Sequence, residues 1–183
     1  AERIVKINWL KNLLITLILA AMIYSLYSSS GTSRVLAQTI LNIEAVGDAF
    51  VSSSNPDAKY GELSQLEVST FGEESYIKFT VTGAEREVQS AYLRLFVSNG
   101  SPDGPLVYGT GSSWSEVGIT WNNRPPALTG ILDNINRISS NSIIEFDVTQ
   151  YISGDGVYSF VLIPEHKNPV IFDSKEGITP PEL

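Results

Sequence analysis

The chain has 183 residues, one histidine, no cysteine and a formal charge of −8 from 12 basic and 20 acidic residues. Without cysteine it has neither disulfides nor a cysteine nucleophile, so its stability must come from core burial, helped by any metal that binds. The acidic balance argues against nucleic acid or an anionic membrane surface as a partner, because recognition of phosphates requires clustered basic residues.

The first part of the chain is hydrophobic and differs from the rest. An apolar run, LLITLILAAMIYSLY, spans residues 13–27, and the small residues Val35 and Ala37 stand at the −3 and −1 positions of a cleavage site. The basic residues that precede the run are Arg3, Lys6 and Lys11. A basic start, a short apolar core and a small-residue exit predict a secretory signal peptide over residues 1–37.

A membrane anchor is the alternative interpretation of this segment. A spanning helix needs about 20 apolar residues, and the run of 15 is shorter than that. The gap between Tyr27 and Ala37 is longer than usual for a signal peptide, which leaves an uncleaved anchor open.

We expect a secreted or cell-surface protein that contacts a membrane only through this segment. Residues 38–183 are long enough for one domain with its own core, which we expect to be monomeric.

From Ile43 onward, apolar and polar residues alternate with the period of two that is typical of β-strands. In SYIKFTV, for example, Ile77, Phe79 and Val81 share one face. AYLRLFV and IIEFDV alternate in the same way, and VYSFVLI is apolar on both faces, as expected for a central strand. The turn-forming stretches that separate the predicted strands are SSSNPDAKYG, NGSPDGP, NNRPP and SGDG.

Helical signals are weak in this part of the chain. A single turn is indicated around DVTQYI, where Asp147 or Thr149 can cap it. Short strands at regular spacing with long connecting loops predict an all-β fold. We therefore expect an antiparallel jelly-roll β-sandwich, preceded by the hydrophobic signal segment.

The order of these segments resembles the DNRLRE domain family, also described as carbohydrate-binding module family 96 or disaggregatase-related. The similar segments include DAFVSSSNPDAKYG, VYGTGSSWSEVGITWNNRPP, FDVTQYISGDGVYSFVL and FDSKEGITPPEL. The resemblance covers about Ala45 to Leu183. It implies a non-catalytic jelly-roll domain on a secreted or surface protein of a microbe. It also implies polysaccharide binding and a frequent association with calcium.

Three departures from the family pattern bear on the site. This chain has Lys59 before the YG pair, where family members usually carry Asn, and Lys175 before the EG pair, where they often carry Arg. The family also tends to continue past PPEL. The resemblance therefore implies a closing strand beyond Leu183, and a sheet edge left open without it.

Two tryptophans, Trp114 and Trp121, stand seven residues apart in a polar, turn-rich stretch. Trp121 alternates in phase with Ile119, so we expect it in the core. Trp114 lies among serines, where its ring can serve as a sugar platform or fold back over one end of the sandwich. For Trp114 both interpretations stay open.

Oxygen-bearing side chains suggest a calcium site, because calcium takes six to eight oxygen ligands. The terminal strands of a jelly roll are commonly neighbours, so Asp48 is expected to meet Asp173 and Glu176 in space. The candidate ligands are Asp48, Asn55, Asp57, Asp173 and Glu176. The alternative is that these side chains form turns and solvated charges.

Basic and aromatic side chains suggest a shallow polysaccharide site. An arginine can grip a carboxylate with two parallel hydrogen bonds, although pairing with a nearby acidic residue is the plainer interpretation of each basic residue. The candidate sugar-binding residues are Tyr60, Arg94, Trp114, Arg124 and Lys175.

Catalytic motifs are not evident in this sequence. A catalytic triad would need His166, which lies in the polar segment PEHKNP. Two carboxylates suffice for glycosidase chemistry, but a small sandwich without a deep cleft rarely raises the pKa of one of them. We therefore favour a non-catalytic polysaccharide-binding module with structural calcium. The alternatives are a structural or adhesive surface spacer and, third, a small polysaccharide-degrading enzyme.

Overall fold

The computed structural model describes residues 17–19, 22, 39–84 and 88–183 of the chain. The predicted signal segment falls largely outside the described residues, and so does its cleavage site. The four residues of the segment that are described are helical and exposed. Among the described residues, no helix is long and apolar enough to cross a membrane.

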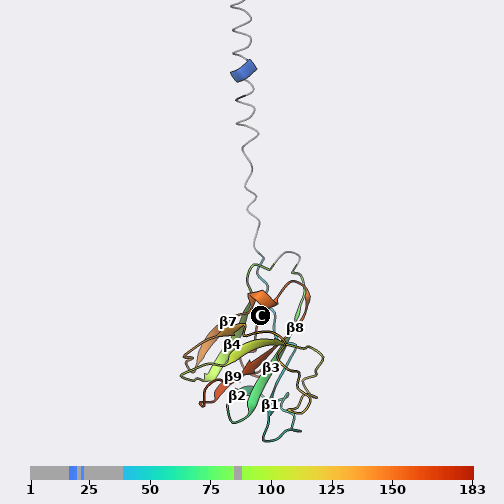
Figure 1. Ribbon diagram of the computed structural model, residues 1–183, viewed down its shortest axis with the longest axis vertical. Helices are drawn as coiled ribbons and strands as arrows, with labels where there is room; N and C mark the ends of the chain where they lie inside the picture. Colours follow the sequence, from blue (N-terminus) through green and yellow to red (C-terminus); the bar gives the residue numbers. More distant parts are fainter. Residues whose placement is uncertain (1–16, 20–21, 23–38, 85–87) are drawn as a thin grey trace, which may run out of the picture. The chain divides into compact units, whose positions relative to one another are not determined.

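Residues 40–183 form a structural unit of two antiparallel sheets packed face to face (Figure 1). The five-stranded sheet contains, in order, β1 (Gly47–Ser52), β3 (Glu73–Val81), β8 (Gly156–Ile163), β5 (Leu106–Thr110) and β6 (Asp133–Asn134). The four-stranded sheet contains β2 (Gln65–Val68), β9 (Val170–Asp173), β4 (Tyr92–Asn99) and β7 (Ser142–Asp147). The prediction of an all-β, antiparallel β-sandwich is confirmed, and the chain crosses between the sheets at most of its connections.

The main core lies between the two sheets and is built by the predicted alternation. In β3, Ile77 and Phe79 point into this core, and in β4 Leu93, Leu95 and Val97 do so from the opposite sheet. All five side chains are at most 1% exposed. Because side chains alternate along a strand, each sheet also has an outer face.

The outer face of the five-stranded sheet is covered by residues 111–127, here named the covering segment. Its Trp114 and Ile119 pack with Tyr76 and with other side chains of the sheet in a second apolar cluster. The segment is fastened near its end, where Thr110 Oγ1 donates a 2.7 Å hydrogen bond to the Pro126 carbonyl. The part of this face around Tyr76 is therefore a second buried layer, whereas Thr80 and Val157 of the same face stay exposed.

The last residues of the chain pair with two segments that are distant in sequence. Glu182 pairs with Arg94 of β4 on one side and with Glu44 on the other. Backbone hydrogen bonds of 2.9 and 2.8 Å join Ile43 and Leu183 in both directions.

The predicted helical turn is present as a 3₁₀ helix, Thr149–Tyr151. It lies next to Asp147, whose Oδ1 accepts a 3.0 Å hydrogen bond from the Thr149 N–H.

Candidate functional site

Three loops meet along the β1 margin of the sandwich, and we refer to residues 53–64, 112–126 and 174–178 together as the loop margin. Ser174 Oγ donates a 2.6 Å hydrogen bond to the Leu63 carbonyl, which joins the first loop to the third. The Asn122 side-chain amide donates a 2.8 Å hydrogen bond to Asp57 Oδ1, which joins the first loop to the second. Candidate residues from distant parts of the sequence are thereby brought together.

Tyr60 lies in the first of these loops and is half-buried. Its ring stacks on Phe50 of β1, with 4.2 Å between the ring centroids and 10° between the planes. The stack fixes the orientation of the Tyr60 ring at the edge of the sandwich. The neighbouring Lys59 is exposed.

Glycine at position 61 allows the first loop to approach the covering segment closely. A Cβ atom at Gly61 would lie only 2.2 Å from the carbonyl oxygen of Glu116. Any larger residue would push the two loops apart. The contact seats Glu116 next to β1.

Trp114 and Trp121 differ in burial. Trp114 is only 9% exposed and lies in the second apolar cluster, so the hypothesis of an exposed sugar platform there is wrong. Lys78 Nζ lies 4.3 Å from the centroid of its ring. Trp121, expected in the core, is half-buried at the margin of the cluster. The physical reason is that the backbone N–H groups of Gly118 and Ile119 both donate hydrogen bonds to the Ser115 carbonyl. The backbone therefore turns here, and side chains do not alternate between two faces as they do in a strand.

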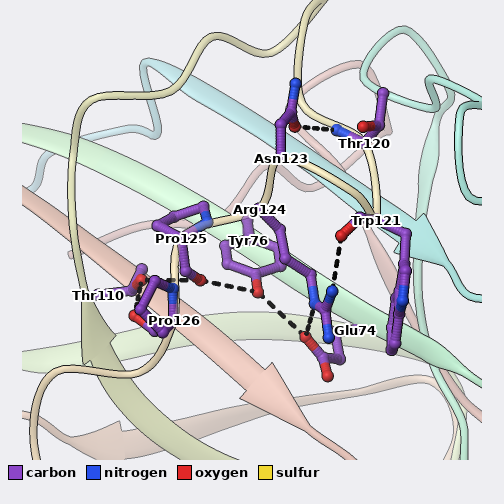
Figure 2. Close-up of polar contacts among 9 residues, drawn as sticks. All are labelled: Glu74, Tyr76, Thr110, Thr120, Trp121, Asn123, Arg124, Pro125 and Pro126. Carbon is purple, nitrogen blue, oxygen red and sulfur yellow. Dashed lines mark hydrogen bonds and ion pairs between the residues drawn. The ribbon is translucent and has the colours of Figure 1, made fainter.

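Arg124 belongs to a network that we name the aromatic clasp, formed with Glu74, Tyr76 and Trp121 (Figure 2). Its guanidinium carbon lies 3.4 Å from the Trp121 ring centroid, and its Nε is 2.9 Å from Glu74 Oε2. The Tyr76 hydroxyl is 3.0 Å from the same oxygen, and burial raises the pKa of this hydroxyl well above its usual range. One carboxylate thus satisfies two donors and holds the cation flat on an indole ring.

Arg94 lies apart from the loop margin, on the outer face of the four-stranded sheet. Its Nε is 3.0 Å from Glu145 Oε1 and its Nη1 is 2.6 Å from Glu182 Oε2. The structure therefore does not place Arg94 with Tyr60, Arg124 and Lys175.

Asp48, Glu116 and Glu176 form an acidic cluster, in which one carboxylate oxygen of each residue lies within 4.8 Å of the others. Asp48 is only 1% exposed and comes from β1, Glu116 from the covering segment and Glu176 from the loop after β9. The backbone N–H of Asp48 donates a 3.0 Å hydrogen bond to Glu116 Oε1. The backbone N–H of Lys175 donates a 2.7 Å hydrogen bond to Asp48 Oδ2.

The electrostatics of the acidic cluster follow from burial and like charge. Burial raises the pKa of Asp48 from 3.8 to about 7, and the nearby Glu176 and Glu116 carboxylates add to the rise, against the Lys175 backbone N–H, which lowers it. Lys175 Nζ is 3.3 Å from Glu116 Oε1 and also contacts Glu176 Oε1. These contacts raise the pKa of Lys175, and the hydrogen bond to Glu176 has the largest effect.

The cluster fits a hard divalent cation by its donor set, since calcium binds carboxylate oxygens. The ammonium group of Lys175 already stands in as a cation among these oxygens. Of the predicted ligands, Asp48 and Glu176 lie in the cluster.

The other three predicted ligands do not lie in the cluster, and each has other bonding partners. The Asn55 carbonyl closes a turn with Ala58, Asp57 accepts from Asn122, and Asp173 Oδ2 accepts a 3.1 Å hydrogen bond from the Thr179 N–H. Asn55 thus has the turn-forming role that was the alternative to calcium ligation, whereas Asp57 joins two loops and Asp173 binds a residue that follows β9.

Glu116 and Glu74 are the site residues that sequence reasoning missed. Glu116 lies 68 residues from Asp48, and Glu74 lies 50 residues from Arg124, although Glu74 is only two residues from Tyr76 in β3. The one sequence signal for Glu116 is Gly61, whose missing side chain makes room for it.

Two further surface features lie outside the loop margin. A shallow hollow of about 300 Å³ is lined by residues 100–102 and 137–140, and none of the candidate residues lies there. His166 is exposed, and its Nδ1 accepts a 3.2 Å hydrogen bond from the Asn168 N–H.

Comparison with known families identifies the domain. A model of carbohydrate-binding module family 96 matches residues 39–183. The chain belongs to this family. The match confirms the resemblance inferred from the sequence, and the family 96 region contains both the acidic cluster and the aromatic clasp. Membership points to a binding module rather than to a catalytic domain, and the chain matches none of the curated proteins.

Proposed function

We propose that this family 96 module is a non-catalytic part of an exported protein and binds extracellular polysaccharide at the loop margin. The observation that carries the proposal is that Tyr60, Arg124 and Lys175 lie on three loops that are bonded to one another, in a domain of a carbohydrate-binding family. The signal-like segment in residues 1–37 supports export.

The chemistry of the loop margin suits a sugar ring. An aromatic face covers the apolar C–H face of a pyranose, and adjacent polar groups bond to its hydroxyls. Tyr60 would supply the face, since Phe50 holds its ring in place. Asp57, Asn122 and Lys59 would supply acceptors and donors, because they are exposed in the same loops.

Calcium in this proposal has a structural role at the acidic cluster. The residues that would hold it are Asp48, Glu116 and Glu176, which come from three separate elements. An ion bound by all three would tie the covering segment and the loop after β9 to β1. Binding to the folded state alone would raise the melting temperature.

Affinity-gel and glycan-array assays test the proposal, with Tyr60→Ala as the site variant and Tyr92→Ala as the matched control. Tyr92 is an exposed tyrosine on the four-stranded sheet, outside the loop margin. We expect Tyr60→Ala to weaken polysaccharide binding about tenfold, or about 1.4 kcal/mol, and Tyr92→Ala to leave it unchanged. Equal loss in both variants would contradict the placement of the site.

A structural or adhesive spacer is the second candidate, favoured by the burial of Trp114 and by the guanidinium that covers one face of Trp121. Both rings are thereby engaged within the protein. The same assays decide between the candidates, since a spacer would retain no polysaccharide in calcium or in chelator.

A further inference from the structure

Lys175 is unusual among the cations of this domain because its ammonium group lies among carboxylates that belong to three elements. Nζ contacts Glu116 Oε1 at 3.3 Å and also contacts Glu176 Oε1. The side chain is 30% exposed, so the amine lies at the mouth of the cluster. Its backbone N–H is bonded to Asp48 at the same time.

Acidic groups outnumber basic groups in this arrangement. Three carboxylates lie near the Lys175 ammonium group, Glu116 also interacts with Lys78, and the buried Asp48 is the least accessible of the three carboxylates to solvent. The oxygens nearest Lys175 Nζ, Oε1 of Glu116 and of Glu176, belong to the carboxylates that a divalent cation would use. A second cation at this distance repels the ammonium strongly, because water screens the pair only partly.

We propose that the Lys175 ammonium and a divalent cation exclude one another from the acidic cluster. In the metal-free protein, Lys175 is the internal counter-ion that holds the loop after β9 against the covering segment. When calcium binds, the Lys175 side chain swings out of the cluster to solvent. The loop itself stays in place, since the backbone N–H of Lys175 remains available to Asp48.

The exchange has a consequence that rests on the proposed function. The released amine joins the loop margin, where Ser174 already ties the loop after β9 to the loop that carries Tyr60. Calcium would then add a cationic donor to the polysaccharide-binding surface as it stabilises the loops. Metal binding and ligand binding would be positively coupled through one side chain.

Calcium titration by calorimetry tests the exclusion directly. Lys175→Met retains the length of the side chain and removes the charge, so it should bind CaCl₂ roughly tenfold more tightly than the wild type. Lys167→Met is the matched control, because Lys167 is an exposed lysine between β8 and β9, outside the loop margin. It should bind calcium as the wild type does. Equal or weaker binding by Lys175→Met, or no binding by either protein, would overturn the proposal.

Amine labelling of the wild-type protein gives a second measurement that needs no variant to fold. Lys175 should react several-fold faster with an acylating reagent in CaCl₂ than in chelator, as read by peptide mass spectrometry, whereas the exposed Lys167 should react at the same rate in both. An unchanged Lys175 rate at a calcium concentration that saturates the site would contradict the displacement. Neither measurement involves a polysaccharide, so failure here leaves the proposed function to be decided by the affinity gels.

Discussion

The acidic cluster and the aromatic clasp both place one cation against carboxylates at the edge of the covering segment, yet they differ in charge balance. In the clasp, Glu74 meets one guanidinium and one hydroxyl, and Arg124 is covered by an indole ring. In the cluster, three carboxylates share Lys175, and the pKa of Asp48 is raised to about 7. The comparison teaches that the clasp is complete in itself, whereas in the cluster a divalent cation would compete with Lys175 for the same carboxylate oxygens.

The largest expected effect is on the pH dependence of the free energy of unfolding, which Asp48 of the acidic cluster should influence when a chelator keeps the protein free of metal. Because burial raises the pKa of Asp48 from 3.8 to about 7, the folded state holds a proton that the unfolded state has lost between these values. The stability contributed by Asp48 is therefore full below about pH 4 and is lost as the pH rises to about 7, by at most about 4 kcal/mol.

Asp48→Asn sharpens this comparison, since its amide stays neutral and still offers an oxygen to the Lys175 N–H. Urea unfolding from pH 4 to pH 8 should show the variant gaining on the wild type as the pH rises. A difference that does not vary with pH would break the distinction between the cluster and the clasp.

An intermediate effect is expected from the clasp. Glu74→Ala leaves the Arg124 guanidinium and the Tyr76 hydroxyl without their shared acceptor, and should lower the free energy of unfolding by about 2–3 kcal/mol. Because the network is partly buried, 0.5 M NaCl should change this loss little. The matched control is Glu62→Ala at an exposed position, which should stay within about 0.5 kcal/mol of the wild type.

The smallest effect is expected from Arg94, which pairs with Glu145 and Glu182 on an open face. Arg94→Met should cost no more than about 1 kcal/mol of stability, and added salt should reduce the loss. An affinity gel run with the same variant tests whether Arg94 contributes to polysaccharide binding. A marked loss of retention would show that the binding surface includes the four-stranded sheet.

Sequence periodicity predicted the sheets well because strand burial follows the residue types directly. SYIKFTV, AYLRLFV, IIEFDV and VYSFVLI fall in β3, β4, β7 and β8, with their alternate side chains in the core. The short strand β6 has only two residues, too few to show a period. It gave no sequence signal for that reason.

The candidate site was less predictable because its residues meet through loops. Asp48 and Glu176 were found from the expected proximity of the terminal strands, and this argument depends on topology. Glu116 was missed, Trp121 was misassigned and Trp114 was left open, because the covering segment folds by turns that leave no period in the sequence. Local patterns therefore specify the layers, whereas long-range contacts specify the site.

The pairing of Ile43–Ala45 with Pro181–Leu183 gives the domain a direction of mechanical weakness. The two segments run antiparallel, with Ile43 opposite Leu183, so tension applied through these two residues pulls the outermost hydrogen bonds first. The bonds would open one after another, as in peeling, instead of sharing the force together. The domain should therefore yield at a low force at this seam, while the two sheets behind it stay intact.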